Sequence, residues 1–114
     1  GDICLQKVAR GISSQIRRPA DLVARYGGEE FVVVLPNTSD RGALKVANNI
    51  RQAVQSLNLD NPYSQISDVV TISLGVSSTI PNTDNGTSQL LTIADEALYE
   101  AKKRGRNQAV LQSI

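Results

Sequence analysis

The dipeptide Gly27-Gly28 stands between two apolar runs, residues 22–24 and residues 31–35. Glycine adopts the positive φ angles of a tight turn at little steric cost, so this arrangement predicts a β-hairpin. The adjacent pair Glu29-Glu30 places two carboxylates directly after the turn, where their oxygen atoms can bind a divalent cation. From these residues alone, a metal site and a surface hairpin with two solvated glutamates both remain open interpretations.

The size and composition of the chain indicate one globular domain. Its 114 residues suffice for a hydrophobic core, and contents of 40% hydrophobic and 20% charged residues are ordinary for a globular protein. The formal net charge of +1 predicts no general surface for polyanions, so we expect no nucleic-acid partner. Cys4 is the single cysteine, which excludes an internal disulfide and is typical of a reducing compartment.

The start of the chain indicates a piece of a longer protein, because Gly1 is not an initiator methionine. No apolar stretch approaches the ~18–20 residues that a membrane-spanning helix requires, and no signal peptide is visible. We therefore expect any membrane anchor, and any sensor domain, to lie upstream of these residues.

Hydrophobic periodicity predicts helices and strands in the order α-β-β-α-β-α-β. Apolar residues recur at helical spacing within residues 5–16, 43–57 and 90–101. Strand-like patterns occupy residues 21–25, 30–35, 70–76 and 109–111. Pro19 is predicted to end the first helix, and Gly105 to end the last one in a left-handed conformation.

Two of these strands have more specific features. Residues 30–35 are continuously apolar, which predicts a central strand with both faces covered. Residues 70–76 alternate between apolar and polar side chains, and Gly75 among them predicts a bulge or a close approach of another backbone. The whole pattern predicts an α+β fold, in which helices pack against one sheet that contains antiparallel strands.

Charged residues at three places have both a structural and a functional interpretation. Asp2 suits the start of a helix as a capping residue, but it can also bind a ligand. Arg18 and Asp21 share a short bend, where they form either a solvated ion pair or a binding site for a phosphate and a base. The cations within residues 102–106 complement the dipole at the end of the last helix, and they can equally bind a triphosphate.

Four blocks of the sequence resemble, in the correct order, the GGDEF family of diguanylate cyclases. Residues 21–31, DLVARYGGEEF, are similar to the family signature in its GGEEF form. Residues 70–76 resemble the family's later strand, residues 94–107 its last helix and turn, and residues 1–5 the opening of its second helix. The four blocks together cover nearly all of the chain, which makes the resemblance specific.

This resemblance implies a fold like that of adenylate cyclases and polymerase palms, which is a ferredoxin-like α+β arrangement. It implies that two GTP molecules, one on each domain of a homodimer, are condensed into cyclic di-GMP with release of two pyrophosphates. The 3′-hydroxyl of one nucleotide would attack the α-phosphate of the other. Mg²⁺ or Mn²⁺ would polarise that phosphate and neutralise the leaving pyrophosphate.

The resemblance also implies roles for the residues of the signature. Glu29 would be a metal ligand and would help to deprotonate the 3′-hydroxyl, and Glu30 would support the catalytic site at the turn. Gly27 and Gly28 would let the nucleotide lie close to the hairpin.

Outside the signature, the resemblance implies three further substrate contacts. Asp2 would accept hydrogen bonds from the edge of guanine, and Lys102 and Arg106 would contact the β- and γ-phosphates.

An inhibitory site for the product is implied by Arg18 and Asp21, which match the family's RxxD motif for cyclic di-GMP. Family members often complete this site with an arginine from the helix after the hairpin. This chain has Asn49 there, with Lys45 and Arg51 nearby, so we expect product inhibition of altered strength.

The family's leading strand and helix, which carry its first metal-binding Asp and a guanine-binding Asn, have no counterpart in these residues. We therefore expect residues 1–114 to be a single GGDEF domain fragment, running from the second helix to the final strand. It is expected to be cytoplasmic, where GTP and Mg²⁺ are found, and inactive by itself. Two alternatives are a catalytically silent module that senses cyclic di-GMP or GTP, and a dimerisation module that regulates an attached phosphodiesterase.

Overall fold

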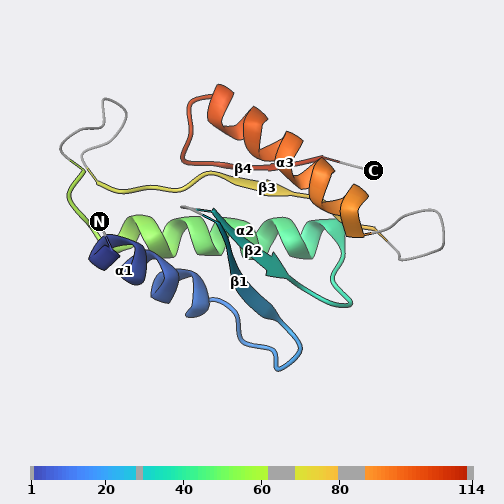
Figure 1. Ribbon diagram of the computed structural model, residues 1–114, viewed down its shortest axis with the longest axis horizontal. Coiled ribbons are helices and arrows are strands. Elements are labelled where there is room, and N and C mark those ends of the chain that lie inside the picture. The colour runs from blue at the N-terminus through green and yellow to red at the C-terminus, as the bar shows by residue number, and fades with distance from the viewer. Residues whose placement is uncertain (1, 28–29, 62–68, 80–86, 113–114) are drawn as a thin grey trace.

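The computed structural model describes residues 2–27, 30–61, 69–79 and 87–112 (Figure 1). Along the chain its elements are α1 (Asp2–Ser13), β1 (Leu22–Gly27), β2 (Glu30–Val34), α2 (Asp40–Ser56), β3 (Leu74–Val76), α3 (Thr87–Lys103) and β4 (Ala109–Leu111). The predicted order α-β-β-α-β-α-β and the α+β class are therefore confirmed.

The strands form an antiparallel hairpin and a separate parallel pair. In the hairpin β1–β2, Leu22 lies opposite Val34, and Gly27 lies opposite Glu30 at the closed end. In the parallel pair β3–β4, Leu74 lies opposite Ala109. Among the described residues, β2 pairs with β1 alone, and Val34 is 47% exposed. The prediction of a single sheet with residues 30–35 as its covered central strand is therefore wrong for this part of the chain.

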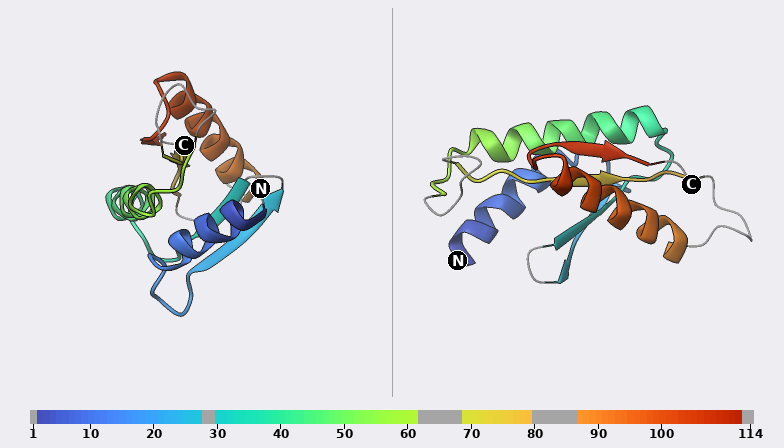
Figure 2. Two further views of the ribbon diagram at one scale, coloured as in Figure 1. Left: turned by 90° about the vertical axis from the view of Figure 1, so that its left-hand side faces the viewer. Right: turned by 90° about the horizontal axis from the view of Figure 1, so that it is seen from above.

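The helices lie on both sides of the strands (Figure 2). α2 packs on one side of the β3–β4 pair and α3 on the other, while α1 packs against α2. The hydrophobic core lies where α1 meets α2, and its buried members are Val8, Ile12, Ile50 and Val54. Partly buried strand residues pack against this cluster from the hairpin and from the segment that leads into β3, among them Val23, Phe31, Val33, Val70, Ile72 and Leu74.

Only the second half of the predicted strand at residues 70–76 belongs to the β3–β4 ladder. The Leu74 amide donates to the carbonyl of Gln108 at 2.9 Å, whereas the Val70 amide donates to the carbonyl of Leu59 at 2.7 Å. β4 is three residues long, so it offers ladder partners to a matching stretch only. The alternation itself is confirmed, because Val70, Ile72 and Leu74 all pack against the core.

Two glycines have the roles that their positions predict. A Cβ atom at Gly75 would lie 2.0 Å from the carbonyl oxygen of Ala94 and 2.3 Å from the amide nitrogen of Leu98, so β3 touches the backbone of α3. Gly105 has a φ of 117° and ends α3, where the Arg106 amide donates to the carbonyl of Ala101 at 3.0 Å. This is the hydrogen bond of a Schellman motif, which satisfies a carbonyl at the helix end.

Hydroxyl groups form hydrogen bonds at two further helix ends. The Ser39 hydroxyl caps α2 by accepting a hydrogen bond from the Gly42 amide at 3.1 Å. α1 ends at Ser13, short of the predicted Ile16, and the Ser14 hydroxyl donates to the carbonyl of Gly11 at 2.7 Å. Among the described residues, we find no helix with the length and apolarity needed to cross a membrane.

Candidate functional site

Arg18 and Asp21 form a two-pronged ion pair in the connection between α1 and β1. The Arg18 Nη2 atom lies 2.8 Å from Oδ1 of Asp21, and Nε lies 3.1 Å from both carboxylate oxygens. The carboxylate side chain is 6% exposed, whereas the arginine side chain is 49% exposed. The structure thus brings together the two residues that match the RxxD motif, and it leaves much of the guanidinium open to solvent.

Arg18 also binds the connection between β2 and α2. Its Nη2 atom donates to the carbonyl of Pro36 at 2.9 Å and to the hydroxyl of Thr38 at 2.6 Å. Between them, Asn37 has a φ of 53°, a left-handed conformation that asparagine tolerates well. Arg18 therefore joins the segment before β1 to the segment after β2, at the open end of the hairpin.

Hydrogen bonding within this ion pair stabilises both charges. The hydrogen bond from Arg18 lowers the pKa of the Asp21 carboxyl, and the charge of the guanidinium acts in the same direction. The same hydrogen bond raises the pKa of Arg18 above its ordinary value. At neutral pH the pair thus presents one fixed positive and one fixed negative group side by side.

The closed end of the hairpin is the expected place of the catalytic turn. Gly27 and Glu30 face each other in the ladder there, and the register shifts between Arg25 and Gly27. Residues 28 and 29 lie outside the described residues, so the roles expected of Gly28 and Glu29 stay predictions. Among the residues that the structure does describe, no group of three or more His, Cys, Asp or Glu side chains converges to hold a metal ion.

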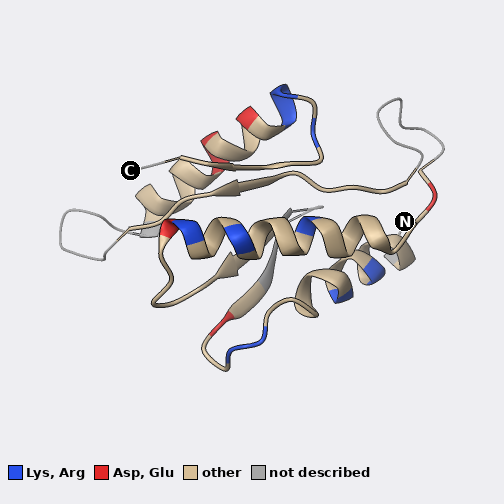
Figure 3. Cartoon of the chain, turned by 180° about the vertical axis from the view of Figure 1, so that it is seen from behind, with Lys and Arg blue, Asp and Glu red and all other residues tan. Residues whose placement is uncertain are grey.

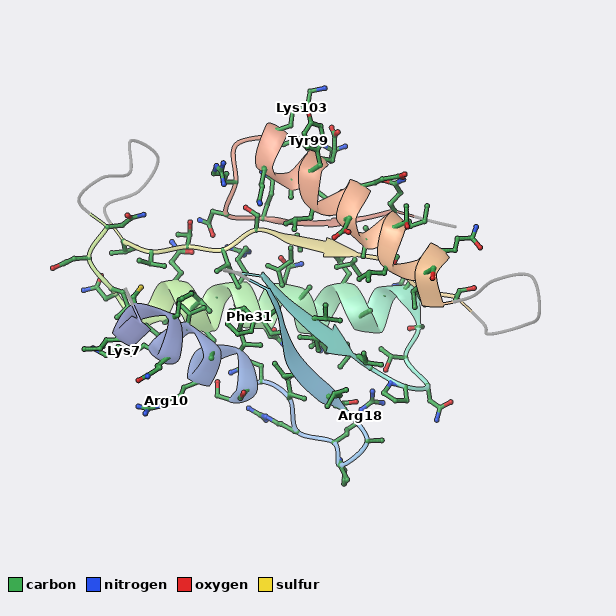
Figure 4. All side chains as sticks on the ribbon, in the orientation of Figure 1. Lys7, Arg10, Arg18, Phe31, Tyr99 and Lys103 are labelled. Carbon is green, nitrogen blue, oxygen red and sulfur yellow. The ribbon has the colours of Figure 1, made fainter. Side chains whose placement is uncertain are left out.

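The length of β1 separates this turn from the Arg18–Asp21 pair. From Leu22 to Gly27 the strand advances five residues, which corresponds to about 17 Å at the usual rise. Figure 4 shows the same separation, with Phe31 near the closed end and Arg18 beyond the open end. Gly27 and the Arg18–Asp21 pair therefore lie at opposite ends of one hairpin.

The remaining predicted site residues lie at helix ends. Asp2 is the first residue of α1. Lys102 lies in the last turn of α3, and Arg106 follows in the turn toward β4 with a φ of 65°. Both cationic residues are exposed, and neither has an ion-pair partner within the described part of the chain. Figure 3 shows the basic character of this end of α3.

Sequence reasoning missed the partners that hold the site residues in place. Thr38 is one of them, because its contact with Arg18 spans twenty positions and leaves no local signal in the sequence. Arg51 was noted only as a neighbour of Asn49 in the sequence, and its described partners are Asn48 and Asn107, both at 3.4 Å. Asn107 has a φ of 49°, and its position after Gly105 and Arg106 was the only hint of a structural role.

Comparison with known proteins gives consistent matches. A family model described as "Diguanylate cyclase, GGDEF domain" matches residues 1–108. Diguanylate cyclase A of Treponema denticola is 46% identical over 111 residues, which cover 97% of this chain and 29% of that relative. The active GGEEF domain of a diguanylate cyclase from Vibrio cholerae superposes with a TM-score of 0.76 at 32% identity, covering 96% of this chain and 67% of that one.

A second solved structure, the GGDEF domain of DgcB from Caulobacter crescentus in complex with c-di-GMP, superposes with a TM-score of 0.81. The two are 28% identical, and the match covers 96% of this chain and 63% of that one. The chain thus spans less than a third of the length of the curated relatives it matches, for example 29% and 25%.

Proposed function

This chain belongs to the GGDEF family of diguanylate cyclases, and on that premise we propose that it is part of a catalytic domain that condenses two GTP molecules into cyclic di-GMP. The observation that carries the proposal is the hairpin β1–β2, whose closing pair Gly27 and Glu30 are the first and fourth residues of the GGEEF motif. Glycine at position 27 leaves the space beside the strand free of a side chain, which favours a close approach of the nucleotide.

The chemistry of the donor set at this turn suits Mg²⁺ or Mn²⁺. Glu29 and Glu30 offer carboxylate oxygens, which are the ligands that these hard cations take in proteins. When bound, the ion would polarise the α-phosphate and neutralise the charge of the departing pyrophosphate. Glu29 would hold the ion and accept the proton of the attacking 3′-hydroxyl.

The other substrate contacts divide between the base and the phosphates. Asp2, at the start of α1, would accept hydrogen bonds from the guanine N–H groups. Lys102 and Arg106 would bind the β- and γ-phosphates, and their exposure without an ion-pair partner in the described residues supports this role. Because each domain holds one GTP, two copies must meet for the bond to form, so the working unit is a homodimer.

Product inhibition would act through the opposite end of the hairpin. The Arg18 guanidinium is half exposed and can bind a phosphate of cyclic di-GMP, while Asp21 can accept from a guanine N–H. A relative of this chain, DgcB, has been solved in complex with c-di-GMP. Asn49 stands where family members often have an arginine, so this inhibitory site would differ from the family's usual one.

We further propose that these 114 residues belong to a cytoplasmic domain that is controlled by a sensor elsewhere in the protein.

The test is an assay of the full-length protein with GTP and Mg²⁺, in which product is identified by its mass and pyrophosphate is measured. Synthesis of cyclic di-GMP that stops on chelation of the metal is expected. A protein that binds cyclic di-GMP through Arg18 but forms none would instead be a silent sensing module.

A further inference from the structure

The turn after α3 has an unusual backbone. Gly105, Arg106 and Asn107 follow one another with φ angles of 117°, 65° and 49°. Two of them carry a Cβ atom, and for Arg106 in particular the left-handed conformation is sterically unfavourable. Such a run persists only where surrounding contacts hold it.

The backbone on either side of Asn107 is held by α3 and β3. The Arg106 amide donates to the carbonyl of Ala101 at 3.0 Å, and the side chain of Gln108 donates to the carbonyl of Arg106 at 3.2 Å. The carbonyl of Gln108 accepts from the Leu74 amide at 2.9 Å.

The side chain of Asn107 is held instead by α2. Arg51 donates from Nη1 to Oδ1 of Asn107 at 3.4 Å, and Asn107 donates from Nδ2 to Oε1 of Gln55 at 3.5 Å. Arg51 and Gln55 are one helical turn apart, so both reach the same side chain from one face of α2. The Nε atom of Arg51 donates to Asn48 at 3.4 Å, which fixes the plane of the guanidinium.

We propose that Arg51 is a positioning residue, which acts through Asn107 to hold Arg106 in place for the phosphates of the nucleotide. This inference rests on the proposed function, which assigns Arg106 to the β- and γ-phosphates. If Asn107 loses its contacts with α2, its φ can relax to negative values, and the direction of the Arg106 side chain then changes. Binding of the β- and γ-phosphates depends on the position of the Arg106 side chain, because small displacements weaken a charge-assisted hydrogen bond.

The positioning role requires the guanidinium group of an arginine at position 51. Its Nε and Nη1 atoms bind two different side chains at once, which the single ammonium of lysine does with poorer geometry. Arg51→Lys keeps the positive charge and is therefore expected to lose most of the effect. This distinguishes positioning from a general attraction between Arg51 and the triphosphate.

The test compares two nucleotides on the full-length protein by calorimetry. The reaction breaks the bond between the α-phosphate and the pyrophosphate, so α,β-methylene GTP is a triphosphate that cannot react, and GMP lacks the β- and γ-phosphates. Arg51→Ala is expected to weaken binding of the triphosphate by about three- to tenfold, the range that one hydrogen bond contributes. Binding of GMP should stay within about twofold, since its affinity does not depend on Arg106.

Two further variants separate positioning from folding. Asn107→Gly allows the left-handed backbone but removes the side chain, so it should weaken triphosphate binding as Arg51→Ala does. Gln52→Ala is the matched control, because Gln52 is an exposed residue of α2 with no described contact to the turn. In an Arg106→Ala background, Arg51→Ala should add no further loss.

The outcomes distinguish this inference from the proposed function. If Arg106→Ala weakens triphosphate binding but Arg51→Ala and Asn107→Gly do not, the positioning role is overturned and the proposed function stands. Equal losses for GMP and for the triphosphate would also overturn it, because they indicate a general structural effect. If Arg106→Ala changes nothing, or the wild type binds neither nucleotide, the phosphate site itself is overturned.

Discussion

The carboxylate of Asp21 lies 2.8 Å from the guanidinium of Arg18, and the nitrogen that makes this contact also binds the carbonyl of Pro36 and the hydroxyl of Thr38. The pair is therefore part of a junction between two chain segments. A phosphate that binds Arg18 has to share or displace these partners. Ligand binding to Arg18 is thus expected to change the conformation of the connection that leads into α2.

The first prediction concerns cyclic di-GMP. Arg18→Ala is expected to weaken binding of cyclic di-GMP by about tenfold or more, because a charge-assisted hydrogen bond to phosphate is lost. Calorimetric titration of the full-length protein measures this. Arg17→Ala serves as the control, since Arg17 is an exposed neighbour with no described ion pair. Equal affinities for the wild type and Arg18→Ala would remove Arg18 from the site.

The second prediction follows from the lowered pKa of Asp21. In the unfolded chain this carboxyl titrates at about 3.9, and in the folded state it titrates at a lower pH. Below pH ~4 the unfolded state therefore binds more protons, and stability falls as the pH approaches the folded-state pKa. Above pH ~5 the stabilisation by the ion pair is fully present.

The measurement is the urea midpoint between pH 6 and pH 2.5 for the wild type and for Asp21→Asn. The wild type is expected to be the more stable of the two at pH 6, and the difference should shrink as the pH falls. A difference that is constant over this range would contradict the account, because the stabilisation by the Asp21 carboxylate would then not depend on its protonation.

The third prediction concerns the contact between β3 and α3. Gly75→Ala places a methyl group against the carbonyl of Ala94 and the amide of Leu98, which are backbone atoms and cannot rotate away. We expect the substitution to lower the free energy of unfolding by about 1–3 kcal/mol, which is the usual cost of overpacking.

Urea unfolding of Gly75→Ala beside Gly42→Ala measures this cost. A Cβ at Gly42 would meet only the side chains of Thr38 and Ser39, at 3.1 Å and 3.3 Å, so the control should change stability much less. Two variants of equal stability would show that α3 does not lie this close to Gly75.

Local patterns in the sequence were sufficient to predict most of the fold. The hairpin, the helix end at Gly105 and the close approach at Gly75 were each predicted from a glycine and its position relative to the apolar pattern. The pairing of strands was less predictable, because the apolar run at residues 30–35 does not specify which neighbour covers it. Within the described residues, β2 remains at the edge of a two-stranded sheet.

The same distinction applies to the candidate site. The pairing of Arg18 with Asp21 spans three residues and could be predicted from the sequence. The contact from Arg51 to Asn107 spans 56 residues, and it exists only because α2 and the turn after α3 pack together. Glu29 was identified from the signature, and its role in the site is still a prediction.

The most direct measurement is the rate of cyclic di-GMP formation from GTP and Mg²⁺ by the full-length protein, compared with Glu29→Gln. Glu100→Gln is the matched control, since Glu100 is a partly exposed residue of α3 that pairs with Arg104 at 3.2 Å. The account predicts that the wild type and the control form product, while Glu29→Gln is slower by about a hundredfold or more, as when a preorganised electrostatic group is lost. Equal rates for Glu29→Gln and the wild type, or no product from a folded wild type, would contradict it.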